Sequence, residues 1–178
     1  MSHPQQMNFV SKIKTFFPEK FSNTKVLEVG SLYINGTVRD FFTNCNYIGI
    51  DIGPGLGVDL IVSGHEYAGA DNSFDTVISC ECFEHNPYWI ETFINMIRVC
   101  KSGGLIVITC ATTGRHEHGT ERTSPKDSPL TVAKGWNYYK NLTQADFTNN
   151  FNIPTLFQKY DFSVDYTSYD LYFWGIKV

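Results

Sequence analysis

The chain has 178 residues, of which 42% are apolar and 15% aromatic, while only 18% are charged. This length favours a single folded domain, and the apolar content excludes a disordered polymer. The formal net charge is −4 and the basic residues are scattered singly, which argues against a nucleic-acid or acidic membrane partner.

Hydrophobic periodicity predicts strands that alternate with helices. Short continuous apolar runs are typical of strands buried on both faces, and the i, i+3, i+4, i+7 spacing that starts at Ile90 is typical of an amphipathic helix. In chain order we expect a helix over 8–17, strands over 25–30, 46–51 and 58–62 with a short helix over 35–42 among them, a strand over 74–79, a helix over 87–100, a strand over 105–109, a short helix over 143–150 and an antiparallel hairpin over 162–178. This order predicts a doubly wound, mostly parallel seven-stranded α/β sheet with helices on both faces and a C-terminal antiparallel hairpin, a Rossmann-like fold.

The segment 111–140 interrupts this pattern, because it is rich in glycine and proline and has little periodicity. We expect it to form a long loop or insertion within one domain that covers residues 1–178. Loops of this length in compact domains are commonly functional.

Targeting signals and disulfides are not expected. No run approaches the ~18 apolar residues of a membrane-spanning helix, and the first residues lack the order of a secretory signal. Five cysteines without a Cys-x-x-Cys pair are typical of buried thiols in a reducing compartment. We therefore expect a soluble, cytoplasmic protein.

The carboxyl ends of the first two strands are the expected ligand site of such a sheet. Glu28 and Gly30 end the first strand, and Asp51 ends the second. A carboxylate at that place can accept hydrogen bonds from both hydroxyls of a ribose, although it can equally cap the following turn. The Gly-x-Gly-x-x-Gly pattern that cradles a pyrophosphate fails, because Leu32 and Asn35 occupy its second and third positions. This favours a nucleoside without phosphate over a nicotinamide dinucleotide.

Four segments, in order, resemble the class I S-adenosylmethionine-dependent methyltransferases, most closely the small single-domain branch often called type 11. The resemblance covers residues 24–110. It implies S-adenosylmethionine as the cofactor and S-adenosylhomocysteine as the product. The segments are Val26–Gly30, Tyr47–Asp51, Asn72–Ser79 with Glu84 and His85, and Lys101–Ile108.

The resemblance also implies roles for individual residues. Glu28 and Gly30 would lie along the methionine part of the cofactor, and Asp51 would hold the ribose. Ile52 would pack on the adenine, and the backbone carbonyls of Ser79 and Cys80 would face the sulfonium.

Two departures from the family pattern concern the cofactor. Leu32 and Ile34 stand where the family has glycines, a change for which Ser31 can partly compensate. Ser63 stands where the family has an acid that recognises adenine. The backbone of Gly64 and His65, or a hydroxyl such as that of Ser63, is then the expected adenine contact.

The acceptor is expected near the insertion, where the densest polar cluster of the chain lies. His116 and His118 are candidates for a general base or orienting group, as is His85 near the start of the helix over 87–100. Local packing of these histidines is the simpler alternative. A His-x-His pair without further ligands nearby in the sequence does not predict a metal site.

Three further residues of the insertion are candidate acceptor contacts, and its charges indicate the acceptor class. Basic residues outnumber acidic ones over 115–140, which favours an anionic acceptor such as a carboxylate or a phosphorylated sugar. The resemblance implies a saccharide or related metabolite that accepts the methyl group on oxygen or nitrogen. A nicotinamide-dependent oxidoreductase and a non-catalytic nucleoside-binding module remain alternatives. The acceptor, the methylated atom and the oligomeric state stay open. The candidate contacts are Arg115, Glu117 and Tyr138.

Overall fold

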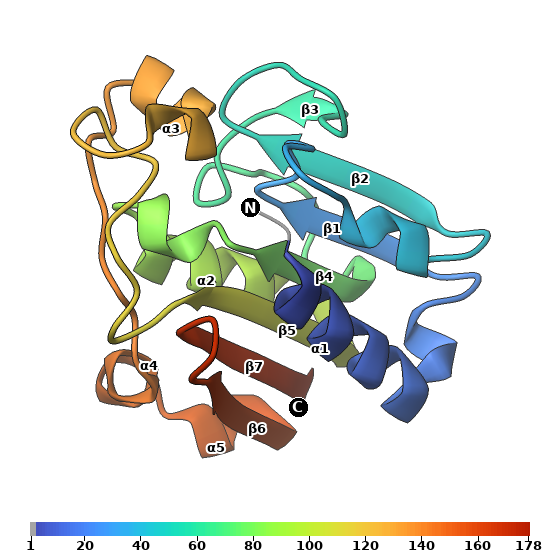
Figure 1. Ribbon diagram of the computed structural model, residues 1–178. Helices are drawn as coiled ribbons and strands as arrows, with labels where there is room; N and C mark the ends of the chain where they lie inside the picture. Colours follow the sequence, from blue (N-terminus) through green and yellow to red (C-terminus); the bar gives the residue numbers. More distant parts are fainter. Residues whose placement is uncertain (1–2) are drawn as a thin grey trace.

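The computed structural model describes residues 3–178 and contains one seven-stranded sheet (Figure 1). The strand order is β3-β2-β1-β4-β5-β7-β6. Strands β2 and β3 are added on one side of β1, and the strands from β4 onward are added on its other side, so the strand order reverses between β1 and β4. The first five strands in this order run parallel, whereas β7 is antiparallel to both β5 and β6. The predicted fold class is therefore confirmed, including the C-terminal hairpin.

The strands follow the predicted apolar runs. Those at the centre of the sheet consist of buried β-branched and aliphatic residues because helices or loops cover both of their faces. Their bounds are β1 Lys25–Val29, β2 Asn46–Asp51, β3 Leu60–Ile61, β4 Phe74–Cys80, β5 Cys100–Ala111, β6 Phe157–Asp165 and β7 Asp170–Lys177.

The two faces of the sheet are covered by different parts of the chain. In Figure 1, α1 (Pro4–Phe16) crosses the front of the sheet and α2 (Trp89–Val99) lies behind it. Val10 and Ile13 of α1 pack with Phe21 in one core cluster. Phe93 of α2 packs in the other cluster, where its ring meets that of Phe147 from α4 (Gln144–Asn150).

The remaining helical segments are short. They are the 3₁₀ turns η1 Pro18–Lys20, η2 Val38–Phe41, η3 Phe83–His85 and η4 Pro125–Asp127, and the helices α3 Pro129–Ala133 and α5 Ile153–Leu156. Residues 111–140, expected as a long loop, thus contain η4 and α3. Figure 1 shows α3 over the ends of β1 and β2 toward which their arrows point.

Two predicted boundaries differ from the structure. The first helix begins at Pro4 rather than near residue 8, because His3 is its N-cap and proline is well suited to the first helical turn. The strand expected over 58–62 is reduced to Leu60–Ile61, both exposed at the edge of the sheet. Edge strands are commonly short, because a long unpaired edge invites association with another chain. Among residues 3–178, no helix has the length and apolar character needed to cross a membrane.

Candidate active site

A cleft opens at the carboxyl ends of β1, β2 and β4. It lies at the point where the strand order reverses, which is the usual place of a ligand site in such a sheet. Three sets of residues form its wall: the ends of the strands, the loop after β1, and the insertion. Among the predicted residues that line it are Glu28, Gly30, Ser31, Asp51, Cys80 and His85.

Asp51 connects the second strand with the loop after the first. Its Oδ2 atom accepts a hydrogen bond from the backbone N–H of Leu32 at 3.0 Å, and Oδ1 accepts one from that of Ile52 at 2.8 Å. Burial raises the pKa of the carboxyl, while these two N–H groups oppose the rise. Each oxygen still has a second lone pair, so the carboxylate can also accept from a diol in the cleft.

Glu28 is buried at the floor of the cleft. The Tyr47 hydroxyl donates to its Oε2 atom at 2.9 Å. Burial raises the pKa of the Glu28 carboxyl to about 8, with the hydrogen bond from Tyr47 acting against it. A cationic group placed in the cleft would therefore meet a carboxyl that gains by ionising.

The loop after β1 approaches the segment that follows β4 closely at Gly30. This residue has a φ of +80°, and a Cβ atom there would lie 2.6 Å from the Cβ of Cys82. The neighbouring Leu32 directs its side chain toward Gly55, where a Cβ would meet its Cδ1 atom at 2.2 Å. The fold thus requires a glycine at Gly30, the first glycine of the family pattern. At the second position of the pattern, the side chain of Leu32 packs against Gly55 instead.

A second, smaller cavity adjoins the cleft, since both are lined by Gly30 and Asp51. Ile52, Ser63 and Gly64 line it, which brings these three predicted residues together. The Ser63 hydroxyl donates to the Glu66 carboxylate. The Glu66 carboxylate therefore lies beside Ser63, the position where the family pattern has an acid that recognises adenine. Glu66 is three residues further along the chain than that position.

An aromatic cluster stands over this second cavity. His65 stacks on Tyr88 with ring centroids 4.2 Å apart, and Tyr88 meets Trp136 edge to face at 5.4 Å. Trp136 belongs to the insertion and lines the cavity. His65, a predicted adenine contact, is therefore positioned by its packing against Tyr88, which lies outside the four segments that resemble the methyltransferase family.

The insertion covers the cleft. Asp127 and the first residues of α3, including Leu130, line its wall. Leu130 also packs against Gly53, where an added Cβ would lie 2.7 Å from its Cδ2 atom. The insertion, near which the acceptor was expected, therefore forms one wall of the candidate site.

His85, which lines the cleft, meets His118 from a distant part of the chain. Their rings lie edge to face with centroids 4.9 Å apart, and Tyr139 packs on both. Burial lowers the pKa of His85 to about 3 and also lowers that of His118. Both rings are consequently neutral at pH 7.

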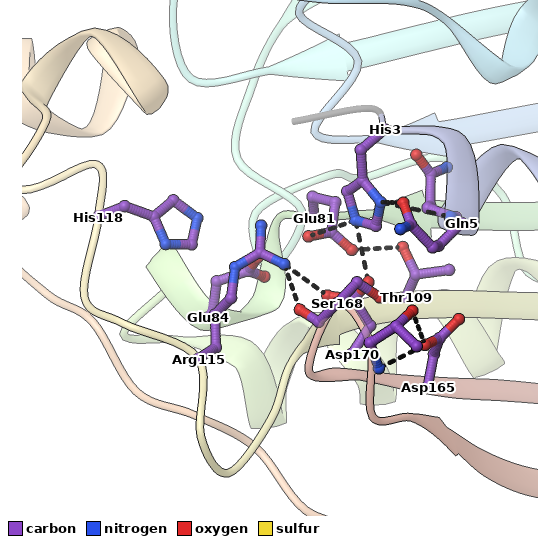
Figure 2. A network of polar contacts seen from close by, with 12 residues as sticks. His3, Gln5, Glu81, Glu84, Thr109, Arg115, His118, Asp165, Ser168 and Asp170 are labelled. Carbon is purple, nitrogen blue, oxygen red and sulfur yellow. Dashed lines mark hydrogen bonds and ion pairs between the residues drawn. The ribbon is translucent and has the colours of Figure 1, made fainter.

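A polar network lies beside these histidines (Figure 2). The Nε2 atom of His3 lies 2.9 Å from Asp170 Oδ2 and 3.6 Å from Glu81 Oε2. The Thr109 hydroxyl donates to Glu81 at 2.9 Å, and the Arg115 guanidinium donates to Asp170 at 3.2 Å. The network joins the start of α1 to the ends of β4, β5 and the beginning of β7.

We expect His3 to contribute stability that depends on pH. Burial disfavours its charged form, but hydrogen bonds and charge from Asp170 and Glu81 outweigh this and raise its pKa from 6.5 to about 10. The ion pair therefore contributes fully below about pH 6.5 and is lost as the pH rises toward 10. His3→Gln should lower the free energy of unfolding by about 2 kcal/mol at pH 6 and by much less at pH 10.

Urea unfolding at the two pH values measures this effect. His116→Gln is the matched control, because His116 is exposed. An equal loss for His3→Gln at both pH values would contradict the ion pair.

The other residues predicted to contact the acceptor lie outside the two cavities. The carboxylate of Glu117 accepts from Arg122 and Thr120, and Arg115 is held by Asp170 and by the carbonyl of Ser168. His116 is exposed, and Tyr138 is half-buried. None of these four lines the two cavities.

Ser79 lies in the interior of the sheet. Its hydroxyl donates to the carbonyl of Val29 at 2.8 Å, so the side chain joins β4 to β1. The predicted role involved only its backbone carbonyl, and the side chain is not among those that line either cavity.

Sequence reasoning gave no individual role to several residues of the site. Glu81 is buried and has a φ of +52°, a strained conformation for a residue with a side chain, of a kind that clusters at functional sites. Glu84 is fully buried, and His3 comes from a segment not expected to be helical. The available signal was the presence of Glu81 and Glu84 directly after a strand end.

Comparisons with known proteins found a matching family model and solved structures with the same fold. Residues 27–108 match the family model described as "Methyltransferase domain". A comparison of the sequence with curated proteins found no match.

Solved structures share the fold at low sequence identity. A Burkholderia thailandensis 1,6-didemethyltoxoflavin-N1-methyltransferase, solved with S-adenosylhomocysteine, is 12% identical with a TM-score of 0.66 over 97% of this chain and 78% of its own. The YcgJ protein of Bacillus subtilis is 12% identical with a TM-score of 0.65, covering 98% of this chain and 99% of its own.

A third structure is that of Haemonchus contortus phosphoethanolamine N-methyltransferase 2 in complex with S-adenosyl-L-methionine. It is 15% identical with a TM-score of 0.64 over 96% of this chain. The present chain spans 52% of that protein, and 47% of a sarcosine dimethylglycine methyltransferase-like protein from Galdieria sulphuraria.

Proposed function

We propose that this chain, whose residues 27–108 match the methyltransferase-domain model, is a class I S-adenosylmethionine-dependent methyltransferase that transfers a methyl group to oxygen or nitrogen of a small molecule. S-adenosylmethionine is the proposed methyl donor and S-adenosylhomocysteine the product. The five cysteines are free thiols, which suits the reducing cytoplasm, where we place the reaction.

The observation that carries this proposal is the pair of adjoining cavities joined at Asp51. The larger one has Glu28 at its floor, which suits an ammonium group. The smaller one has apolar Ile52 and polar Ser63, which suit a nucleobase. Asp51 lies between them, as a carboxylate that holds the ribose of such a molecule should.

The donor, when bound, supplies an electrophilic methyl group on a sulfonium. The residues of this chain have to align the donor with the acceptor and exclude water. Glu28, Asp51 and the backbone near Gly30 would bind and orient the donor. The insertion, through α3, would exclude water from above.

The two histidines at the acceptor end have a defined protonation state. His85 lines the cleft, and both His85 and His118 are neutral at pH 7 because burial lowers their pKa. A neutral imidazole can accept a hydrogen bond from an acceptor hydroxyl or amine and thereby orient its lone pair toward the methyl group.

The charges of the insertion give limited support to an anionic acceptor. Arg115, Arg122 and Lys140 are each paired with a carboxylate. Most of the positive charge counted in the sequence is therefore already compensated. We propose a small-molecule acceptor without requiring that it be an anion or a saccharide.

Calorimetric titration with S-adenosylmethionine, S-adenosylhomocysteine and NAD tests the proposal. We expect the first two to bind and NAD not to bind, because Leu32 fills the turn that a pyrophosphate would need. Mass-spectrometric detection of methylated products across a panel of hydroxyl and amine acceptors then separates an enzyme from a binding module. Binding of NAD alone would contradict the proposed function.

A further inference from the structure

Three side chains lie together beside the cleft, and one of them, Glu84, has no role in the proposed methyl transfer. Glu84, His85 and His118 each direct one donor atom into the same space, and these atoms all lie within 4.8 Å of one another. Glu84 and His85 come from η3, whereas His118 comes from the insertion. The sequence shows only a His-x-His pair, so the fold is what supplies the further ligands.

Glu84 is the most informative of the three. Its side chain is fully buried, and in the part of the chain that the structure describes neither carboxylate oxygen has a hydrogen-bond partner. No lysine or arginine of residues 3–178 forms an ion pair with it. A buried carboxylate without a partner is costly, and a bound cation removes that cost.

The neighbouring polar network does not supply this cation. Arg115 and His3 lie nearby, but they are paired with Asp170, and His3 also faces Glu81. In Figure 2, Glu84 and His118 stand beside the network without a dashed line to any of its members.

The two histidines have the features of metal ligands. His118 Nδ1 lies 3.0 Å from the carbonyl oxygen of His116, so it must carry the proton, and the lone pair of the ring is then on Nε2. In metal-binding histidines, the ring nitrogen that does not bind the metal commonly donates its N–H to a backbone carbonyl, which fixes the orientation of the ring. His85 is 3% exposed, its ring is packed against His118 and Tyr139, and its Nε2 lies 4.0 Å from Glu84 Oε1.

We propose that Glu84, His85 and His118 bind a divalent transition-metal ion, with Zn²⁺ preferred over Mg²⁺. Two imidazoles and one carboxylate are a donor set typical of catalytic zinc and other open transition-metal sites, whereas Mg²⁺ prefers oxygen ligands. Ligand atoms on one zinc ion lie about 3–4 Å apart, given metal–ligand distances of roughly 2.0–2.2 Å. The three side chains thus need to approach by about 1 Å when the ion binds.

The remaining coordination positions of the ion would face the cleft, because His85 is part of its lining. An acceptor hydroxyl bound there would have a lowered pKa and would give up its proton to water in the cleft more readily. Its oxygen would then take the methyl group as the bond from that group to sulfur breaks and S-adenosylhomocysteine leaves. This role rests on the proposed function, whereas binding of the ion itself does not.

Titration of the metal-free full chain with Zn²⁺ alone, and separately with Mg²⁺, tests the proposal. We expect one zinc site per chain and at least tenfold weaker binding of Mg²⁺. Glu84→Gln and His118→Ala should each weaken Zn²⁺ binding by more than about 100-fold, since even loss of a supporting residue around a metal costs 10–100-fold. His116→Ala is the matched control, because it removes an exposed imidazole of the same loop and should change the affinity by less than threefold.

Substitution with Co²⁺ identifies the ligands, because five free cysteines could also hold a soft metal. We expect visible absorption of a site with nitrogen and oxygen ligands and no thiolate charge-transfer band. A thiolate band, no zinc site, or equal affinity in Glu84→Gln would overturn the proposal. Glu84→Gln also guards against misfolding, since it replaces an unpaired buried carboxylate by a neutral group of similar shape and should not lower the melting temperature of the metal-free protein.

The affinity for S-adenosylmethionine is measured on the same samples. Zinc binding without any affinity for S-adenosylmethionine would leave the metal site intact and contradict the proposed function. Binding of S-adenosylmethionine without a zinc site would contradict the metal site and leave the proposed function intact.

Discussion

Asp51→Ala is expected to weaken S-adenosylmethionine binding by about 2–3 kcal/mol, a loss of roughly 30- to 160-fold in affinity. The carboxylate lies between the two adjoining cavities and keeps free lone pairs after its two backbone contacts. Removal of the side chain would leave the ribose hydroxyls without their acceptor. Calorimetric titration of the variant measures the loss.

The same carboxylate also holds the loop after β1, so a control has to separate the two roles. Asp51→Asn keeps one oxygen for the N–H of Leu32 but cannot accept from both hydroxyls, and we expect it to lose most of the affinity as well. Asp59→Asn is the matched substitution outside the cleft, because Asp59 accepts from Gly49 N–H and pairs with Arg39. Its effect should stay below threefold. Unchanged affinity in Asp51→Ala would contradict the ribose assignment.

Gly30→Ala is expected to have the second large effect, on both stability and donor binding. The residue has a φ of +80°, and the added Cβ would lie 2.6 Å from the Cβ of Cys82, which is not the movable end of a side chain. The left-handed conformation costs about 1–2 kcal/mol, and overpacking adds typically 1–3 kcal/mol. The loop would have to move away from β4 and so deform the wall of both cavities.

Gly103→Ala distinguishes the two contributions to this loss. Gly103 also has a positive φ, of +71°, but a Cβ there would have no neighbour within 4 Å. We expect this variant to lose only the conformational part, about 1–2 kcal/mol, and to bind S-adenosylmethionine normally. Denaturant unfolding and calorimetry on the pair measure both effects. Equal losses in the two variants would mean that the contact with Cys82 does not matter.

The central part of the fold was predictable because its signals are local. The strands that end at Val29 and Asp51 are short apolar runs, and α2 has a strong 3.6-residue period. Parallel strands that alternate with crossover connections can form few topologies, so the place of Glu28 and Asp51 at one edge of the sheet followed from the pattern. The assignment of roles to these residues remains a prediction.

The short strand β3 shows why other boundaries were less predictable. Its apolar residues read as a five-residue strand, but only Leu60 and Ile61 pair with β2, at the edge of the sheet. The length of an edge strand depends on how far its neighbour continues beside it, which is a property of the packed sheet.

The sequence by itself determined the order of strands and helices, the strand-end acids and the poor fit of the first loop to a pyrophosphate. Each of these depends on residues a few positions apart. Only the tertiary structure decided that α3 covers the cleft, that His3 reaches Asp170, and that Glu84 meets His118. The reason is physical: these contacts join segments tens of residues apart that lack periodicity, so their positions come from packing against the completed sheet.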